Sequence, residues 1–324
     1  MLPNEVWEGR SAKTWTLRTL ITPLSWLYGF GWQVYLAAYK IGFKTAKSPH
    51  RPVICVGNLV VGGSGKSPLT IYIAKVVQRL GRQVVIGCSG YGAPHSQDAC
   101  IAPDGPLSAA EWGDEPAMFR WLLPNVPLVV GRNRVLAAEL VHATFPKAVL
   151  VMDDGFQHLP LAKQFAVVID DPMAKNFRCL PAGPYREPRW NVRRANVVVP
   201  RDFRVKTHPM RIVDVEGKTV IPQSYAVLCA LGNPSKFLKM LADQYPNDRK
   251  DFPTILKGDH DPLSERDLWV DLPIELPIIV TAKDWVKLRD RTDIGERQFF
   301  IAMHEVELEP SEEFKVRVER SFNE

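Results

Sequence analysis

The stretch VVGGSGKSPLT, residues 60–70, combines residue types that could bind a nucleotide phosphate. It contains Gly65-Lys66-Ser67, as phosphate-binding loops of the pattern G-x-x-x-x-G-K-[ST] do, although Val60 stands where that pattern has its first glycine. The apolar run 53–56 before the stretch predicts a strand, and the residues from Lys66 onward predict a helix. A strand that leads through a glycine-rich loop into a helix is the context that a phosphate site needs.

Each part of this loop has an expected role. Backbone N–H groups of the glycine-rich turn point at a bound anion, and the helix N-terminus adds about half a positive charge. We expect Lys66 to reach the β- and γ-phosphates and the Ser67 hydroxyl to hold Mg²⁺, while Val60 lies at the loop entry, where loss of a glycine is tolerable. The expected nucleotide-binding residues of the loop are Val60, Val61, Gly62, Gly63, Ser64, Gly65, Lys66 and Ser67. The alternative is a glycine-rich turn with an incidental lysine.

A pair of acidic residues follows a later apolar run. VLVMDDGFQH, residues 149–158, places Asp153 and Asp154 directly after a predicted strand. Enzymes with a phosphate loop use an aspartate at this position to bind the metal. Asp-Asp-Gly alone is more often a turn, but together with the loop it predicts a magnesium site. His158 could orient a carboxylate or be an ordinary core histidine, and the residues leave both readings open.

A third acidic motif is WGDEPAMF, residues 112–119. Asp114 and Glu115 stand at a predicted helix start, with Pro116 in the first turn. An N-cap aspartate and a first-turn glutamate stabilise a helix without any further function. The residues by themselves favour that structural reading.

Length and composition suit a protein of two ordinary domains. The chain has 324 residues, 46% of them hydrophobic and 24% charged, and 27 prolines. Its five cysteines form no C-x-x-C pair, so we expect buried thiols in a reducing compartment and neither a disulfide framework nor a zinc site.

Basic residues gather near the N-terminus. The net charge is only +5, yet residues 9–97 hold eleven Lys and Arg and no Asp or Glu. Such a region favours an anionic partner, which could be a nucleic acid, a phosphorylated substrate or an anionic lipid surface. A solvated basic face is the simpler alternative.

Residues 19–39 have no charged side chain but are rich in tryptophan and tyrosine. Their length would just cross a bilayer as a helix, but Pro23 and several glycine and polar residues interrupt them. Tryptophan and tyrosine prefer the membrane–water boundary, and Arg18 and Lys40 flank the run. We predict a helix that lies in the membrane interface, with a true span and a buried core helix as alternatives.

From residue 52 the pattern alternates between strands and helices. Continuous apolar runs separated by helices predict a parallel sheet covered on both faces. The predicted strands are 52–56, 83–87, 127–131, 148–152, 165–169 and 196–200, with helices at 66–80 and 133–143. Residues 204–224 are more polar and predict a connection, after which a second α/β set follows.

We therefore predict three regions of the chain. Residues 1–50 form a membrane-associated helical segment, residues 51–210 a P-loop NTPase-like core domain, and residues 211–324 a smaller α/β domain. The last helix, predicted at 310–322, could pack back on the core domain.

Taken together, the motifs resemble those of the tetraacyldisaccharide 4'-kinases, the lipid A kinases of Gram-negative inner membranes. Each motif is unspecific alone, but their combination and order are specific. They are PLSWLYG (23–29), ICVGNLVVGGSGKSP (54–68), SGYG (89–92), GDEP (113–116), LVMDDGFQH (150–158), LPAGPYREP (180–188), GDHDPLS (258–264) and TAKDWVKL (281–288). Ser89, Ser67 and Ala282 stand where the family commonly has arginine, threonine and glutamate.

The resemblance implies a two-domain architecture with the site in a cleft. It implies transfer of the γ-phosphate of ATP, with Mg²⁺, to the 4'-hydroxyl of a lipid A disaccharide 1-phosphate. Asp114 would act with His260 as base, and Glu115 would support the metal or the nucleotide. The expected catalytic residues are Asp114, His260 and Lys66; the expected metal ligands are Ser67, Asp153 and Asp154; the expected substrate contacts are Arg134, His158 and Arg186.

The partners and location follow from the same resemblance. We expect a glycolipid substrate and a membrane surface, with no nucleic acid and no obligate protein partner, at the cytoplasmic face of the bacterial inner membrane as a peripheral protein. One alternative is a GTPase or ATPase switch, or a metallochaperone-type protein, on the same core. A GTPase would need an N-K-x-D segment, and TAKD (281–284) has Thr281 in place of the asparagine. Another, a scaffold that binds ATP without catalysis, leaves GDEP, DDGFQH and His260 without a role.

Overall fold

The computed structural model describes residues 6–7, 9, 11–171, 174–232, 234–246 and 252–322. Within this part, residues of the first domain form a seven-stranded sheet in the order β3-β4-β2-β5-β1-β6-β7. All neighbouring strands run parallel except β3, which is antiparallel to β4. The strands are β1 (Val53–Asn58), β2 (Val84–Cys88), β3 (Cys100–Ile101), β4 (Leu128–Val130), β5 (Val149–Asp153), β6 (Phe165–Ile169) and β7 (Val197–Val199).

Continuous Val, Ile and Leu runs build this sheet because both of its faces are covered. Successive side chains of β1 enter different clusters: Ile54 and Val56 pack with α3, whereas Val53 packs with α6. The helices of this domain are α3 (Lys66–Arg79), α4 (Ala109–Trp112), α5 (Asp114–Leu122) and α6 (Arg134–Thr144), with 3₁₀ turns η1 (Pro94–Ser96) and η2 (Arg189–Arg194). The predicted parallel-sheet α/β core is confirmed.

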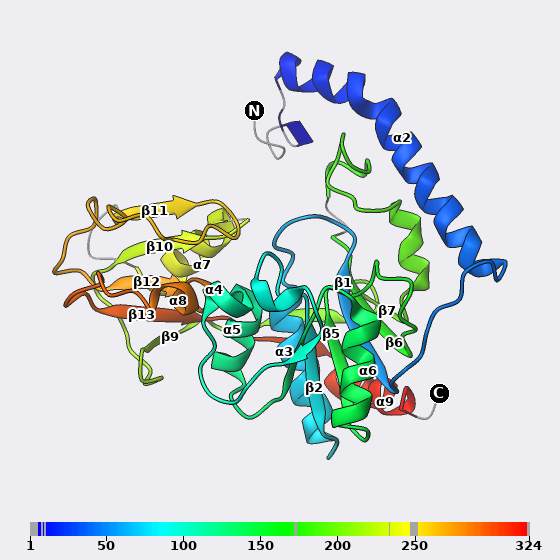
Figure 1. The fold of residues 1–324 in the computed structure, drawn as a ribbon. Coiled ribbons are helices and arrows are strands. Elements are labelled where there is room, and N and C mark those ends of the chain that lie inside the picture. The colour runs from blue at the N-terminus through cyan, green and yellow to red at the C-terminus, as the bar shows by residue number, and fades with distance from the viewer. Residues whose placement is uncertain are drawn as a thin grey trace.

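A second sheet lies beside the first domain in Figure 1. The described residues place five strands in the order β11-β10-β12-β13-β9, and β9 runs antiparallel to β13. The strands are β9 (Arg211–Asp214), β10 (Ala226–Ala230), β11 (Thr254–Lys257), β12 (Ile278–Thr281) and β13 (Phe299–Met303), with helices α7 (Pro234–Gln244) and α8 (Ala282–Leu288). The predicted second α/β unit is confirmed.

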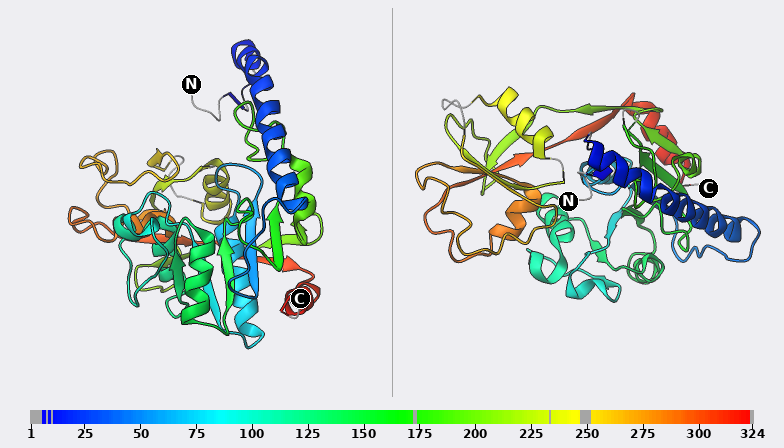
Figure 2. Two further views of the ribbon diagram at one scale, coloured as in Figure 1. Left: turned by 45° about the vertical axis from the view of Figure 1, so that its right-hand side comes forward. Right: turned by 90° about the horizontal axis from the view of Figure 1, so that it is seen from above.

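The chain passes between the two domains twice. Strands β8 (Arg204–Thr207) and β14 (Val306–Glu309) pair antiparallel where it leaves the first domain and returns. The segment 204–224, which the sequence predicts as a polar connection, thus contains two strands. Strand β8 forms because β14, near the end of the chain, pairs with it, and β9 forms because it joins the second sheet. After β14, helix α9 (Ser311–Arg320) lies against the first domain, as Figure 2 shows. The ring of Phe314 packs against Tyr72 of α3, with ring centroids 5.8 Å apart.

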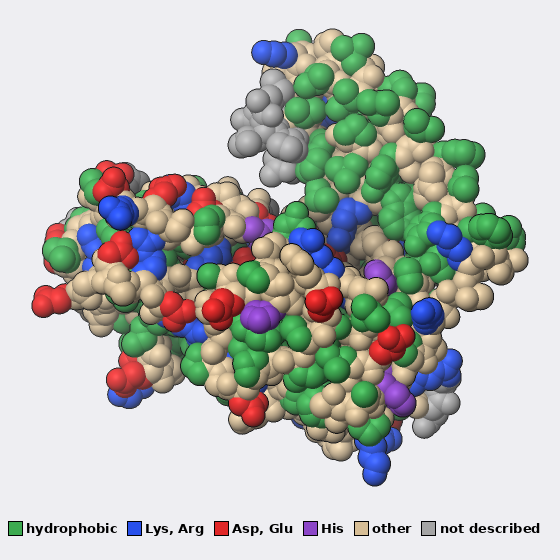
Figure 3. Space-filling model, in the orientation of Figure 1, with side chains coloured by type: hydrophobic (Ala, Val, Ile, Leu, Met, Phe, Trp, Pro, Cys, Tyr) green, Lys and Arg blue, Asp and Glu red, His purple; other side chains and the backbone are tan. Residues whose placement is uncertain are grey.

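Helix α2 (Ala12–Lys40) stands out from the first domain (Figure 1). It continues through Pro23, and the Ser11 hydroxyl accepts a hydrogen bond from the Thr14 N–H at its start. Large apolar side chains cover much of its surface (Figure 3), so it is not a buried core helix. The exposed ones are Trp15, Leu17, Leu20, Leu24, Trp26, Leu27, Tyr28, Phe30 and Val34. Among the described residues no helix combines the length and the apolar character that a membrane span requires.

One side of α2 contacts the loop that contains LPAGPYREP. The Ser25 hydroxyl accepts a hydrogen bond from the Ala182 N–H at 2.9 Å, and the Tyr28 hydroxyl donates to the Arg186 carbonyl at 2.7 Å. A Cβ on Gly29 would lie 3.4 Å from Pro188, so a small residue lets the helix and the loop approach. The helix is therefore held by hydrogen bonds to the domain rather than by a large buried apolar face.

The position of α9 predicts a large loss of stability when its anchor is removed. Phe314→Ala should lower the free energy of unfolding by about 3–5 kcal/mol, because the buried ring leaves a cavity. Val316→Ala, at an exposed position of the same helix, should change it by no more than about 0.5 kcal/mol. Denaturant unfolding measures both. Equal effects of the two substitutions would contradict the packing of α9 on the first domain.

Candidate active site

The glycine-rich loop joins β1 to α3 at the carboxyl end of β1. Gly62 and Gly65 have φ angles of 96° and 84°, which residues with a side chain rarely adopt. A Cβ at either position would meet nothing within 4 Å, so backbone conformation and not space requires glycine. Gly65 caps α3 without a side-chain hydrogen bond. The first N–H groups of α3 are therefore open to an anion.

The two valines at the loop entry pair with the LPAGPYREP segment. Val60 forms an isolated antiparallel bridge with Tyr185, and the Val61 N–H donates to the Pro184 carbonyl at 2.9 Å. The Val61 amide is thus already used and is not free for a phosphate. A β-branched residue suits this strand-like pairing better than glycine does, which explains Val60 at the first position of the pattern. Nucleotide contact through the side chains of Val60 and Val61 stays a prediction.

Lys66 extends from the start of α3 toward the carboxyl ends of β1 and β5. Its Nζ lies 3.4 Å from Asn58 Oδ1 and 3.9 Å from Asp154 Oδ2. Asn58 also donates from Nδ2 to the Ser64 hydroxyl at 2.6 Å. The loop, its lysine and the second aspartate therefore meet at one edge of the sheet, as the sequence predicts.

Asp153 ends β5 and is almost completely buried. The Thr70 hydroxyl, on α3, donates to its Oδ1 at 2.7 Å, while its Oδ2 has no partner among the described residues. Burial, and next the nearby Glu115 carboxylate, raise the pKa of Asp153 to about 7. A buried carboxylate oxygen without a partner beside a phosphate loop is what a cation ligand should look like.

These residues fit Mg²⁺ better than a transition metal. Nowhere in the described ranges do three or more His, Cys, Asp or Glu side chains form a cluster that could hold a metal ion alone. Mg²⁺ does not need such a cluster, because it usually binds through one or two protein oxygens together with phosphate and water oxygens. Asp153 Oδ2 and the Ser67 hydroxyl, in the first turn of α3, are the candidate protein ligands.

Asp154 differs from its neighbour because Arg186 already binds it. Arg186 donates to both carboxylate oxygens of Asp154, at 2.8 and 3.0 Å, and also to the Asn58 carbonyl at 3.0 Å. Burial by itself raises the pKa of Asp154, but the hydrogen bonds from Arg186 and the charge of Lys66 outweigh it and lower that pKa. Both oxygens of Asp154 already have a partner, whereas Asp153 Oδ2 has none among the described residues, so Asp153 is the stronger candidate. Contact of Arg186 with a substrate stays a prediction.

Arg134 and His158 occupy buried or partly buried positions. Arg134 is buried and donates to the backbone carbonyls of Gly131 and Asp153, at 3.0 and 3.2 Å. These bonds tie the ends of β4 and β5 together. Burial, and next the charge of Arg134, lower the pKa of His158 to about 4, so its ring is neutral near pH 7. The arrangement gives Arg134 a structural task, and substrate contact by either residue stays a prediction.

Asp114 and His260 meet across the two domains although 146 residues separate them. His260 Nδ1 lies 3.0 Å from Asp114 Oδ2. Burial alone would raise the pKa of Asp114, but the hydrogen bond with His260 and the charge of Lys283 outweigh it and lower this pKa to about 2. The same hydrogen bond raises the pKa of His260 against the effect of burial. An ionised carboxylate thus faces a histidine from the other domain, as the resemblance implies.

Glu115 follows Asp114 in the first turn of α5 and lies beside the same acidic group. Burial raises the pKa of Glu115, and its charge is one cause of the raised pKa of Asp153. Three carboxylates from α5 and β5 therefore interact near the phosphate loop. A role of Glu115 in binding the metal or the nucleotide is consistent with this position.

Three further residues of the site are not among the site residues that the sequence predicts. Asn58 binds Lys66, Ser64 and Arg186. Thr70 lies one helical turn after Ser67, and this spacing on α3 could have indicated that both face the aspartates. Lys283 lies 3.5 Å from Asp114; it belongs to TAKDWVKL, but nothing in that motif indicates this contact.

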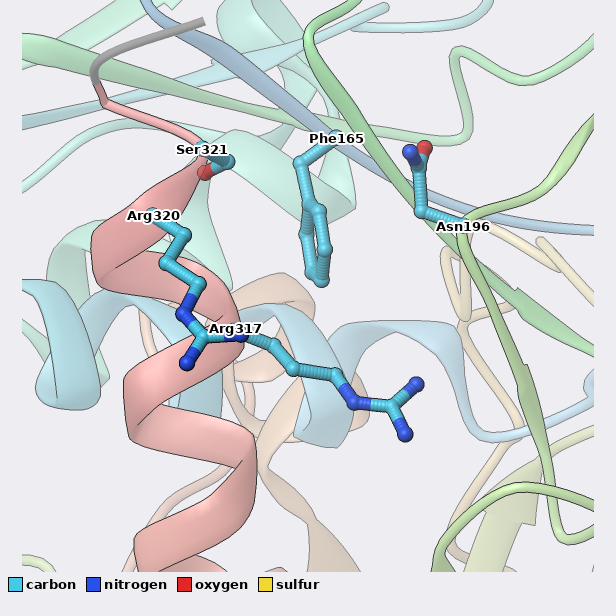
Figure 4. A pocket seen from close by; sticks show the side chains of 5 residues that line it. All are labelled: Phe165, Asn196, Arg317, Arg320 and Ser321. Carbon is cyan, nitrogen blue, oxygen red and sulfur yellow. The ribbon is translucent and has the colours of Figure 1, made fainter.

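A surface pocket of about 220 Å³ lies apart from these residues (Figure 4). Its walls include Phe165, at the start of β6, and Arg317 and Arg320 of α9. The start of β6 is at the amino edge of the parallel sheet, whereas the phosphate loop and Asp153 lie at the carboxyl edge. Ligands of such sheets bind at the carboxyl edge, so this pocket is not the candidate site.

The contact between Asp114 and His260 predicts a measurable change in titration. His260 should titrate above its ordinary pKa of 6.5 in the unmodified chain, because the Asp114 carboxylate stabilises the charged ring. Asp114→Asn should lower the His260 pKa, whereas Asp98→Asn, at an exposed aspartate, should leave it unchanged. An NMR titration of the ring measures it. If Asp114→Asn leaves the pKa of His260 unchanged, the contact is contradicted.

Comparisons with known proteins point to one family. The model of the family described as Tetraacyldisaccharide-1-P 4'-kinase matches residues 17–323. The tetraacyldisaccharide 4'-kinase of Shewanella sp. (strain W3-18-1) is 32% identical over 306 residues, covering 89% of this chain and 87% of that protein. The one of Shewanella sediminis is 34% identical over 289 residues, covering 85% and 83%.

One solved structure is similar to this chain over nearly the whole length of both. The crystal structure of LpxK from Aquifex aeolicus in complex with ATP matches with a TM-score of 0.80 and 28% identity, covering 94% of this chain and 99% of that chain. The resemblance inferred from the sequence motifs is thus confirmed by the family match, by the relatives and by the fold. On this evidence the chain belongs to the tetraacyldisaccharide-1-P 4'-kinase family.

Proposed function

We propose that the chain transfers the γ-phosphate of ATP to the 4'-hydroxyl of a tetraacyldisaccharide 1-phosphate. The observation that carries this proposal is the contact between Asp114 and His260, which joins the two domains beside the phosphate loop. The relatives named above are 4'-kinases of this substrate, and the similar structure contains ATP. The acceptor is therefore a glycolipid, a precursor of lipid A.

The phosphate loop would bind and align the nucleotide. The N–H groups at the start of α3 would face the phosphates, and Lys66 would offset the charge of the β- and γ-phosphates. Mg²⁺, held by Asp153 and Ser67, would neutralise further phosphate charge when bound. Phosphoryl transfer requires alignment and charge neutralisation more than covalent chemistry from the protein, and this site offers both.

Asp114 would accept the proton of the acceptor hydroxyl. Its carboxylate is ionised at neutral pH because its pKa lies near 2. A carboxylate with this pKa is a weak base. In a largely dissociative transition state, however, the attacking hydroxyl becomes acidic only late in the reaction, so a weak base that is well placed is sufficient. His260 holds this carboxylate from the second domain and shares its charge.

The alternative of a guanine-nucleotide switch finds no support in TAKD (281–284). Thr281 caps α8, and its hydroxyl donates to the Asp284 carboxylate at 2.7 Å. Asp284 is completely buried and also accepts a hydrogen bond from the Ala230 N–H. Hydrogen bonds within the second domain therefore already use the aspartate that would have to bind guanine.

The exposed apolar surface of α2 supports attachment to a lipid surface. Trp26 and Phe30 lie one turn apart on α2 and are 71% and 65% exposed. Aromatic and aliphatic side chains on an exposed helix, with Lys40 and Lys44 at its end, suit the interface of an anionic membrane. We place the protein at the cytoplasmic face of the inner membrane as a peripheral protein, since ATP is available there and the acylated acceptor lies in the bilayer.

An assay with radiolabelled ATP tests the reaction. The purified chain should transfer label from the γ-phosphate to a tetraacyldisaccharide 1-phosphate in detergent when Mg²⁺ is present. Asp114→Ala should lower kcat by about 10²-fold or more, as loss of a general base does, and Lys66→Ala by about 10²–10³-fold, as loss of a charge-stabilising group does. Wild-type rates in both variants, or no labelled glycolipid with the unmodified chain, would refute the proposed reaction.

A vesicle assay tests the membrane proposal. Trp26→Glu/Phe30→Glu should weaken binding to vesicles that contain anionic lipid at least about tenfold, because each large apolar side chain contributes about 1.5–3 kcal/mol on burial. Ile221→Glu/Val270→Glu is the matched control, since both residues are highly exposed but lie in the second domain. Co-sedimentation measures the bound fraction. Equal loss in both double variants would speak against α2 as the attachment site.

A further inference from the structure

The TAKDWVKL segment, residues 281–288, has no role in the reaction described so far, although it begins beside the Asp114–His260 contact. Its first turn is rigidly fixed. The Thr281 hydroxyl and the Asp284 carboxylate bind each other at 2.7 Å, and Asp284 also accepts the Ala230 N–H at 3.2 Å. The start of α8 is therefore tied to the second sheet, and side chains that leave this turn have a defined origin.

Lys283 extends from this turn toward the first domain. Its Nζ lies 3.2 Å from Asp259 Oδ1, 3.5 Å from Asp114 Oδ2 and 3.4 Å from His260 Nε2. The side chain is only 16% exposed. Burial lowers the pKa of Lys283, but the charges of Asp114 and Asp259 outweigh it and raise this pKa, so the ammonium group stays charged. One cation thus contacts groups from both domains.

The loop that contains His260 needs such support. His260 and Leu263 have φ angles of 61° and 54°, which residues with a side chain adopt only when their surroundings enforce them. Lys287, one helical turn after Lys283, donates to the Asp261 carbonyl at 2.9 Å. The two lysines of α8 therefore hold this loop on both sides of His260.

Lys283 also contacts the second ring nitrogen of His260. An ammonium group has only donors, so His260 Nε2 faces Lys283 as an acceptor when the ring is neutral. The ring proton then resides on Nδ1, where it points at Asp114. The Asp114 carboxylate, which can only accept, favours the same tautomer, so Asp114 and Lys283 act on the ring together.

We propose that Lys283 is a positioning residue that holds Asp114, Asp259 and His260 together across the domain boundary. It keeps the Asp114 carboxylate and the His260 ring in the arrangement that the acceptor hydroxyl requires. This inference rests on the function proposed above for Asp114 and His260.

Kinetics of the full chain test this role. Lys283→Met removes the charge at similar length, Lys283→Arg retains it, and Lys239→Met is the control at an exposed lysine of α7. Lys283→Met should lower kcat about 10- to 100-fold with KM for ATP changed less than about threefold, since alignment and not nucleotide binding is lost. Lys283→Arg should recover part of the rate, and Lys239→Met should keep all of it.

A double variant separates positioning from general destabilisation. In the His260→Ala background, Lys283→Met should cost less than about threefold further, because residues that act as one unit have non-additive effects. A full additional loss, or a fall in thermal stability of Lys283→Met that matches its loss of rate, would overturn the proposal. Unchanged kcat in Lys283→Met would do so as well, while an inactive unmodified chain would instead refute the proposed reaction.

The ring itself provides a readout that does not depend on activity. Nitrogen-15 NMR of the neutral His260 ring should show the proton on Nδ1 in the unmodified chain and in Lys239→Met. In Lys283→Met the Nδ1 proton should exchange with water faster, because the Asp114 carboxylate and the ring are no longer held together. An unaltered exchange rate of the Nδ1 proton in Lys283→Met would overturn the positioning role even if the chain proved not to be a kinase.

Discussion

Four carboxylates, those of Asp114, Glu115, Asp153 and Asp154, gather beside the loop that would receive a triphosphate. Like charges at such distances raise one another's pKa and oppose the binding of phosphate. Cations from different parts of the chain offset this repulsion: Lys66 and Arg186 at Asp154, and Lys283 at Asp114. Asp153 has a buried oxygen without a partner among the described residues, which is why it is the candidate for a metal ion. The rest of the structure serves to hold these charges in place.

The parallel sheet brings the first group together. Val56 of β1 is paired with Asp153 of β5, so β5 ends two residues before β1 does, at the same carboxyl edge of the sheet. The loop that follows β1 and the aspartates that end β5 must therefore lie side by side. Helix α3 then places Lys66 and Thr70, four residues apart, on the face that looks at the aspartates.

The second group of charged side chains forms only where the two domains are in contact. Asp114 belongs to the first domain, whereas His260 and Lys283 belong to the second, and paired strands β8 and β14 connect the two. Helix α2 also contacts the segment of Arg186, through Tyr28. The surface proposed to meet lipid is thus bonded directly to the segment whose Arg186 binds Asp154.

The sequence alone determined the elements and the phosphate loop. Continuous apolar runs such as 148–152 indicate strands covered on both sides, and Gly62 and Gly65 supply the left-handed angles between a strand and a helix. These are local properties, because propensity, periodicity and glycine geometry depend on neighbouring residues. The pairing of Asp114 with His260 came from the family resemblance, and local pattern gave Asp114 only a capping role.

Only the tertiary structure decided which partners the charged side chains have. It turned Arg134 toward backbone carbonyls and Arg186 toward Asp154, and it placed Lys283 beside Asp114. It also gave β8 a partner about one hundred residues later, where the sequence indicated a polar connection. The physical reason is that a charged side chain has no preferred partner until folding removes water from its surroundings and leaves one geometry that satisfies it.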